Sequence, residues 1–102
     1  MKRVMVRYKV KPNRAAENEQ YIKKVFEQLE HERPSALRYA SFKLADGVSF
    51  VHLVSLETAD GSNPLGALAA FRAFTAAIEE RCDEPPVVAN LNEVGSYRLF
   101  GE

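Results

Sequence analysis

Residues Leu37–Glu57 read LRYASFKLADGVSFVHLVSLE, two apolar runs joined by the pair Asp46-Gly47. An Asp-Gly pair favours a tight hairpin turn, because both residues tolerate the positive φ angles that such turns need. The flanking runs are rich in β-branched and aromatic residues, which is typical of strands. We therefore expect two antiparallel strands, Leu37–Leu44 and Ser49–Glu57.

The segments on either side of this hairpin complete a recognisable order. Arg3–Lys11 alternates like a strand, and Arg14–Glu32 repeats apolar residues every three or four positions, which predicts a helix. After the hairpin, Leu65–Cys82 predicts a second helix and Val94–Phe100 a final strand. The order β-α-β-β-α-β is that of the ferredoxin-like fold, an α+β sandwich with a four-stranded antiparallel sheet. At this length we expect one domain over residues 1–102.

Proline and asparagine mark the expected ends of the helices. Asn13 is a candidate N-cap for the first helix, because its side chain can accept from free amides of the first turn. Asn63-Pro64 offers the second helix a cap followed by a proline at its first position. We expect Asp83–Pro86 to stop that second helix.

Composition excludes several classes of partner. Lys plus Arg and Asp plus Glu both number 14, so no net field attracts nucleic acid or an anionic membrane. No apolar run approaches the roughly 20 residues that span a bilayer, and the N-terminal segment lacks a signal-peptide core. One cysteine, Cys82, excludes an internal disulfide. We therefore expect a cytoplasmic protein without a nucleic-acid or membrane partner.

The first strand has two different faces. Val4, Val6, Tyr8 and Val10 point one way and form a surface for helices to cover. The opposite face is basic and carries Arg3, Met5, Arg7, Lys9 and Lys11.

The hairpin strands are apolar on both faces. With a two-residue turn, Lys43 faces Phe50 and Ser41 faces His52. The other face then carries two further pairs, Phe42 with Val51 and Ala40 with Leu53. Two helices cover only one face of so small a sheet, and a second copy of the same sheet is the simplest cover for the other. We therefore expect a homodimer.

Three segments carry a resemblance to a known family. They are the opening Val4–Pro12 (VMVRYKVKP), the strand Phe50–Glu57 that leads into an alanine-rich helix, and the closing Asn92–Phe100 (NEVGSYRLF). In these the chain resembles the dimeric α/β-barrel superfamily, and within it the small antibiotic-biosynthesis-monooxygenase-like proteins. The resemblance implies two ferredoxin-like subunits joined sheet to sheet into a barrel, each with a small cavity. Members of that superfamily oxygenate aromatic polyketides without a cofactor, degrade haem, or have no known reaction.

Two departures from the family pattern argue against haem degradation. Haem-degrading members and several oxygenases of the family have a tryptophan at the end of the third strand, where this chain has Leu56, and the chain contains no tryptophan. No histidine lies between Asn63 and Cys82 to correspond to the haem ligand of the second helix. We therefore expect no haem and no other cofactor or metal.

Four residues are candidates for a site. His52 lies mid-strand, and its ordinary pKa near 6.5 suits a general base. Arg7 and Arg98 lie on strands expected to be neighbours, where either could hold a phenolate or carboxylate. Tyr39 could line a pocket for an aromatic ligand.

Each candidate also has a purely structural interpretation. His52 could be a packing histidine bonded to Ser41 or to a carbonyl. The arginines could form salt bridges with Glu57, Glu93 or a partner subunit, and a strand tyrosine is usually a core residue with its hydroxyl at the rim.

The predicted function is a small cofactor-independent monooxygenase that binds a small aromatic or quinol-type molecule. His52 would remove a proton, and Arg7 or Arg98, together with Tyr39, would stabilise the resulting anion. The alternative is a non-catalytic dimer that binds a small molecule or another protein. An RNA-binding module shares the element order, but Val48 and Leu53 stand where that module needs aromatic residues to stack bases.

Overall fold

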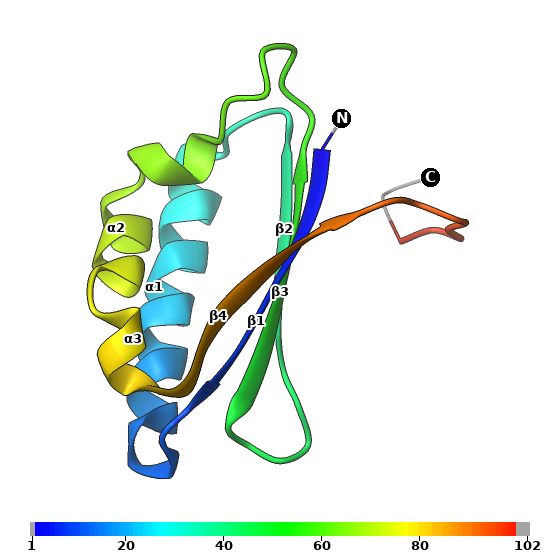
Figure 1. The fold of residues 1–102 in the computed structure, drawn as a ribbon. Coiled ribbons are helices and arrows are strands. Elements are labelled where there is room, and N and C mark those ends of the chain that lie inside the picture. Colours follow the sequence, from blue (N-terminus) through cyan, green and yellow to red (C-terminus); the bar gives the residue numbers. More distant parts are fainter. Residues whose placement is uncertain (1, 100–102) are drawn as a thin grey trace.

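The computed structural model describes residues 2–99 and contains one antiparallel sheet in the strand order β2-β3-β1-β4 (Figure 1). The helices lie together against one face of this sheet. The elements in chain order are β1 (Lys2–Val10), η1 (Pro12–Arg14), α1 (Ala15–Glu32), β2 (Leu37–Lys43), β3 (Ser49–Leu56), η2 (Pro64–Ala67), α2 (Ala69–Ala76), α3 (Ile78–Arg81) and β4 (Cys82–Leu91). The predicted ferredoxin-like α+β fold is confirmed. Among residues 2–99, no helix has the length and apolar character that a membrane span requires.

The hairpin has the predicted register but a longer loop. Lys43 pairs with Phe50 and Ser41 with His52. The amide of Leu44 donates to the carbonyl of Ser49, so four residues rather than two make the turn. An even number of loop residues leaves the facing pairs unchanged.

The Asp46 side chain closes this loop. Its carboxylate accepts hydrogen bonds from the hydroxyl of Ser49 and from the amides of Val48 and Ser49. These bonds lower the pKa of Asp46 to about 2. Gly47 follows with a φ of 77°, the positive value that the Asp-Gly pair predicts.

The predicted second helix, Leu65–Cys82, is in fact three short helices. Asn63 caps η2 as expected, accepting from the amide of Leu65 at 3.0 Å. The chain is extended at Leu68, and it leaves helical geometry again at Ala77. A physical reason for the second break is that Arg81 Nη2 donates to the Phe74 carbonyl at 2.6 Å, the acceptor that residue 78 would use in a continuous helix.

The final strand was predicted at the wrong place. Strand β4 begins at Cys82 and pairs with β1, so Asp83–Pro86 continues the strand instead of only ending a helix. Two prolines are tolerated because β4 is an edge strand and its register shifts beside them. Residues 94–99 of the predicted strand Val94–Phe100 form no strand, and Phe100 lies outside the described residues.

The first helix also starts differently from the prediction. Pro12–Arg14 form a 3₁₀ turn, and Arg14 stands at the N-cap of α1 without a side-chain capping bond. Asn13 is therefore not a cap, because it lies inside the turn that delivers the chain into the helix.

The core lies between the helices and the sheet. Its buried apolar members are Tyr8, Val10, Val25, Phe50, Leu65, Leu68 and Phe74. The expected division of β1 into two faces is confirmed, because Tyr8 and Val10 are buried while Arg7 is exposed.

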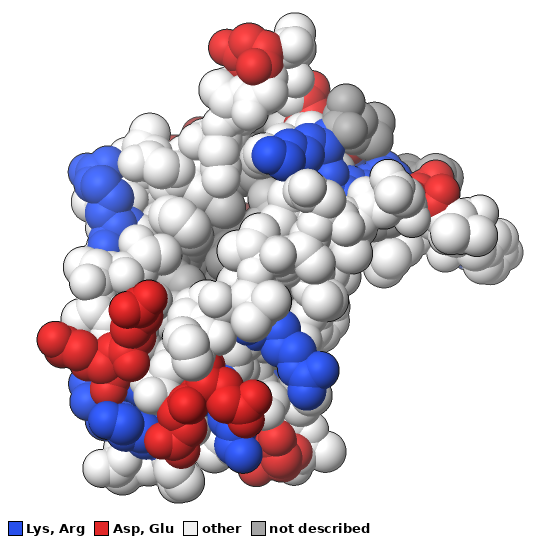
Figure 2. All heavy atoms as spheres, in the orientation of Figure 1, with Lys and Arg blue, Asp and Glu red and all other residues white. Residues whose placement is uncertain are grey.

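The other face of the sheet is open and partly apolar. Phe42 is 51% exposed and Val87 is 66% exposed, and both lie on this face by their pairing with Val51 and Arg7. We call this surface the open face. Figure 2 shows acidic and basic side chains intermixed near α3 and the start of α1, with no continuous patch of one sign in that view.

Candidate functional site

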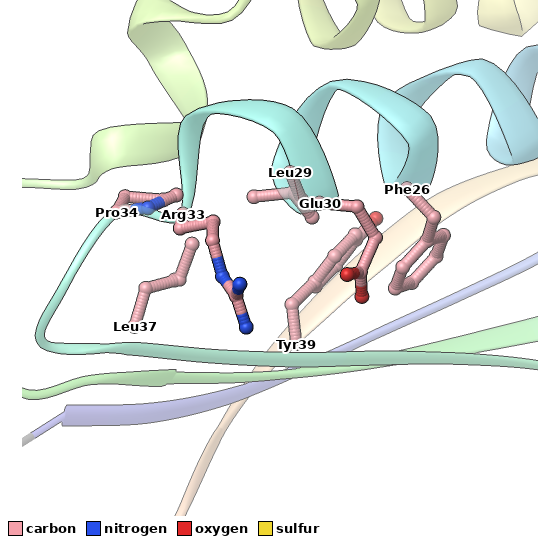
Figure 3. Close-up of a pocket in the computed structure, with 7 residues that line it drawn as sticks. All are labelled: Phe26, Leu29, Glu30, Arg33, Pro34, Leu37 and Tyr39. Atoms are coloured by element: carbon pink, nitrogen blue, oxygen red, sulfur yellow. The ribbon is translucent and has the colours of Figure 1, made fainter.

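A hollow of about 410 Å³ lies between the C-terminal half of α1 and the edge strand β2 (Figure 3). Its lining side chains are Phe26, Leu29, Glu30, Arg33, Pro34, Leu37 and Tyr39. Four of these are aliphatic or aromatic side chains without polar atoms, and three are polar. The wall therefore combines apolar side chains with polar ones and exposes more polar than apolar surface.

The two charged residues of the hollow come from the last turns of α1. Figure 3 shows the ends of Glu30 and Arg33 directed from the helix side toward β2. Within residues 2–99, no ion pair involves either side chain. Both charges are therefore available to a ligand.

Arg33 has a backbone conformation that is costly for its residue type. It ends α1 with a φ of 46° and a ψ of 56°, and its amide donates to the carbonyl of Leu29 at 2.7 Å. This left-handed position usually holds glycine or asparagine. For an arginine it costs on the order of 1–2 kcal/mol. Strain of this kind is concentrated at functional sites, so the guanidinium has a candidate role beyond the fold.

The ring of Tyr39 forms part of the wall of the hollow. The ring stacks on Phe26 with centroids 5.1 Å apart and an interplanar angle of 11°. Its hydroxyl lies 2.8 Å from Nδ1 of His52. Burial raises the pKa of Tyr39 to about 12, so its phenol stays protonated at neutral pH.

His52 lies on the helix-covered face of β3 and is only 3% exposed. Its Nε2 is 2.8 Å from the Tyr8 hydroxyl, and the Ser41 hydroxyl is 2.6 Å from its Nδ1. Burial lowers the pKa of His52 to about 4, which makes the ring neutral at pH 7. The predicted partner Ser41 is thus present, and both ring nitrogens have partners.

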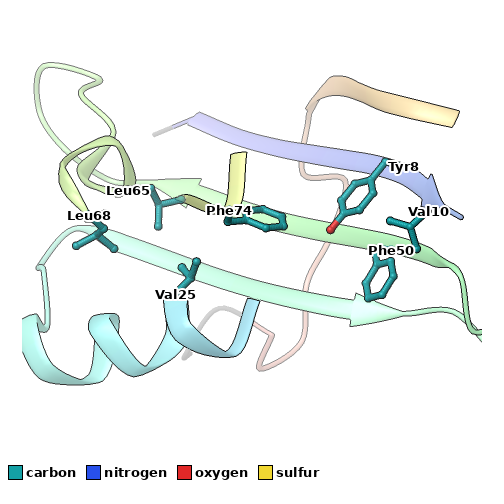
Figure 4. Close-up of a cluster of buried hydrophobic side chains, with 7 residues drawn as sticks. All are labelled: Tyr8, Val10, Val25, Phe50, Leu65, Leu68 and Phe74. Atoms are coloured by element: carbon teal, nitrogen blue, oxygen red, sulfur yellow. The ribbon is translucent and has the colours of Figure 1, made fainter. Parts of the chain in front are cut away.

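The polar contacts of His52 continue through the core to α3. Figure 4 shows Tyr8 reaching from β1 across β3 within the core. The Asn18 amide donates to the Tyr8 hydroxyl at 2.9 Å, and Arg81 Nε donates to Asn18 Oδ1 at 3.2 Å. Arg81 is 1% exposed and lies 4.5 Å from the ring centroid of Tyr21. Among the described residues, every buried side-chain nitrogen and oxygen has a hydrogen-bond partner.

The structure brings together two of the four predicted site residues. His52 and Tyr39 are hydrogen-bonded, whereas Arg7 lies on the open face beside a different hollow. Arg98 is not on a strand: it follows β4 and packs against the ring of Tyr97 at 5.4 Å. The expectation that Arg7 and Arg98 sit on neighbouring strands is therefore wrong.

The acids considered as partners for these arginines pair with other residues. Glu57 forms an ion pair with Arg38, and Glu93 forms one with Arg3.

Four residues of this region were missed by sequence reasoning. Glu30 and Arg33 read as ordinary solvated residues near a helix end. Asn18 and Arg81 carried a usable signal, because each continues an apolar helical stripe, the first with Ile22 and Val25 and the second with Phe74 and Ile78. A polar residue in a buried stripe predicts a hydrogen-bonded core group.

Comparison with known proteins identifies the fold. No family model and no curated protein matches the chain. A crystal structure of an antibiotic biosynthesis monooxygenase matches with a TM-score of 0.75 and 18% identity, over 93% of this chain and 100% of that chain. A protein from Caulobacter crescentus CB15, described as a "putative antibiotic biosynthesis monooxygenase", matches with a TM-score of 0.70 and 24% identity, over 92% and 90% of the two chains.

The description of a third similar structure names a type of reaction. It is a variant of SnoaB, a cofactor-independent oxygenase from Streptomyces nogalater, with a TM-score of 0.67 and 14% identity over 93% of this chain and 94% of that chain. At these identities the likeness establishes the fold alone. The chain has the fold of the antibiotic-biosynthesis-monooxygenase-like proteins, as its sequence resemblance implies.

Proposed function

We propose that the protein binds a small phenolic or quinol-type molecule in the hollow between α1 and β2 and oxygenates it without a cofactor. The observation that carries this proposal is the arrangement of Glu30 and Arg33. Their unpaired charges meet an apolar part of the wall that includes the stacked rings of Phe26 and Tyr39. A flat aromatic ring with an acidic hydroxyl matches this combination of surfaces.

The chemistry needs few groups from the protein. Glu30 is placed to accept the phenolic proton, and the Arg33 guanidinium would stabilise the phenolate that forms. The electron-rich anion passes one electron to O₂, and the two radicals join to form a C–O bond. Loss of water from the resulting hydroperoxide gives a quinone, so one substrate and one O₂ yield one quinone and one water.

The role that we propose for His52 differs from the general base predicted from the sequence. A proton from a ligand in the hollow would reach it only through the hydroxyl of Tyr39, and both of its ring nitrogens already have hydrogen-bond partners. We propose that His52 holds Tyr39 in place and that Glu30 is the base.

The closed network around His52 supports the second candidate function, a non-catalytic dimer that binds a small molecule. Both nitrogens of His52 are engaged, so the network offers a ligand no free proton acceptor. Binding without oxygen consumption would be the signature of this alternative.

We also propose that two subunits pair through their open faces. Phe42 and Val87 are too exposed for a stable solvated sheet, and exposed apolar patches on small proteins mark interaction surfaces. The hollow lies on the opposite side of the sheet, between α1 and β2, so pairing would leave it accessible.

Titration with 1-hydroxy-2-naphthoic acid, followed through backbone amide chemical shifts, tests the binding site. We expect shifts in residues 26–39 and weaker binding by Arg33→Gln. Arg7→Gln is the matched control, because it removes the same charge from the open face. Equal loss of binding in both variants, or shifts confined to the open face, would contradict the site.

A further inference from the structure

A series of hydrogen bonds links Arg81 to Tyr39 through Asn18, Tyr8 and His52, and its donor-to-acceptor direction is fixed. Arg81 can only donate hydrogen bonds, because a guanidinium has no acceptor. Its Nε faces the Asn18 side chain at 3.2 Å, so the atom of Asn18 on that side is the oxygen. The amide nitrogen of Asn18 therefore faces the Tyr8 hydroxyl, which lies 2.9 Å away.

The Tyr8 hydroxyl fixes the direction of the next hydrogen bond, which joins it to His52. Its oxygen accepts from Asn18, and its single proton needs an acceptor in a buried site. Nε2 of His52 is 2.8 Å away and can accept it only when that nitrogen is unprotonated. A neutral His52 then carries its proton on Nδ1.

The opposite tautomer fits the contacts poorly. A proton on Nε2 would point a second donor at the Tyr8 oxygen and leave the Tyr8 proton without an acceptor among the hydrogen-bond partners of Tyr8, which are Asn18 and His52. A buried donor without an acceptor is costly.

We propose that Arg81, Asn18 and Tyr8 are positioning residues that hold His52 in its Nδ1–H tautomer and thereby fix Tyr39 at the wall of the hollow. The Nδ1–H group donates to the hydroxyl oxygens of Tyr39 and Ser41. The Tyr39 proton then points away from His52 toward the Ser41 hydroxyl, with which Tyr39 also shares a hydrogen bond, and the ring keeps its stack on Phe26. The effect of this network on ligand binding rests on the proposed function, whereas the tautomer of His52 is a property of the ligand-free protein.

The test is the tautomer of His52, read from ring ¹⁵N chemical shifts in protein labelled at histidine. The chain has two histidines, so a His31→Gln variant assigns the signals. In the ligand-free wild type we expect Nδ1 to be protonated and Nε2 to resonate as an unprotonated nitrogen. A protonated Nε2 in the wild type would overturn the proposal without requiring any variant to fold.

Asn18→Asp should reverse the tautomer. One carboxylate oxygen would keep the bond to Arg81 and the other would accept the Tyr8 proton, so the Tyr8 oxygen would accept from Nε2–H. Asn18→Leu, which removes the link, is the matched control and should lower stability without a defined reversal. An unchanged tautomer in a folded Asn18→Asp protein would overturn the assigned direction.

Ligand binding separates this proposal from the proposed function. If the reversal occurs and the 1-hydroxy-2-naphthoic acid shifts at Tyr39 are lost with it, the positioning role is supported. If the reversal occurs and those shifts persist, the network does not position Tyr39. If the wild type binds no ligand while its tautomer is Nδ1–H, the proposed function fails and the tautomer assignment stands.

Discussion

The hydroxyl of Tyr39 lies 2.8 Å from Nδ1 of His52, and the two rings stack with centroids 5.8 Å apart. Tyr39 is thus a wall of the hollow on one side and a partner of a buried histidine on the other. Because its ring also stacks on Phe26, a change in the core at His52 would be transmitted to the hollow through one side chain.

Replacing Arg33 with glycine should stabilise the protein and weaken ligand binding. Relief of the left-handed strain on the order of 1–2 kcal/mol, less the greater chain entropy of glycine, gives a net gain of roughly 0.5–1 kcal/mol. Urea denaturation measures the stability, and titration with 1-hydroxy-2-naphthoic acid measures the affinity.

Arg33→Ala is the matched control for this substitution. It removes the guanidinium and keeps the strain, so affinity should fall without a gain in stability. If Arg33→Gly binds the ligand as tightly as wild type, the guanidinium has no part in the site.

The sequence predicted the fold better than the site, for physical reasons visible in particular elements. The hairpin register follows from local turn chemistry and cross-strand faces, both of which are readable over a few residues. Strand β4 was missed because Pro85 and Pro86 usually end a strand, and only its place at the sheet edge makes them acceptable. The position of β4 at the sheet edge is set by the tertiary structure and cannot be read from its local sequence.

The site depended on contacts that no local pattern encodes. His52 and Tyr39 could be placed near each other, because the hairpin register puts residues 39, 41 and 52 close together. The role of Arg33 comes from the left-handed end of α1, and the link from Asn18 to Arg81 spans helices far apart in the chain. Arg98 was assigned to a strand that does not exist, so its predicted role had no geometric basis.

Stability should fall with acid because of His52. Its folded pKa of about 4 lies below its ordinary value near 6.5, so between these values the unfolded chain takes up a proton that the folded protein does not. The free energy of unfolding should therefore decrease as the pH drops from 7 toward 4, by up to about 3 kcal/mol, and this contribution should level off below pH 4.

Urea denaturation at a series of pH values measures this effect in wild type and in His52→Gln. The variant lacks the titrating ring but keeps the same acidic residues, so its stability should fall less between pH 7 and pH 5. Parallel curves for the two proteins would mean that His52 titrates normally in the folded state.

Phe42→Asp should convert a dimer into monomers. The substitution places a charge on the edge strand β2 of the open face, where pairing of two subunits would bury it without a partner. Sedimentation equilibrium should give about twice the 11.5 kDa chain mass for wild type and the single mass for the variant. Ala73→Asp, an exposed position on α2, should remain dimeric. A monomeric wild type would refute the pairing and leave the fold unaffected.

Removal of residues 97–102 should weaken that dimer. Val94 and Tyr97, in the segment after β4, are almost fully exposed in a single subunit, and Figure 1 shows this segment extending away from the sheet. An apolar segment of this kind has a natural place against a second copy. The dissociation constant from sedimentation velocity should rise on truncation, and an unchanged constant would exclude a contribution from the segment.

Oxygen consumption tests the proposed oxygenation most directly. With 1,4-dihydroxynaphthalene in an oxygen electrode, wild-type protein should consume O₂ faster than the uncatalysed reaction and form one 2-hydroxy-1,4-naphthoquinone and one water for each O₂. Formation of 1,4-naphthoquinone and hydrogen peroxide instead would mean oxidation without oxygenation. The acceleration should be lost in Glu30→Gln and Arg33→Ala and kept in Arg7→Gln. A wild-type rate equal to the uncatalysed rate would contradict the oxygenase proposal, and loss of activity in His52→Gln but not in Glu30→Gln would return the role of base to His52.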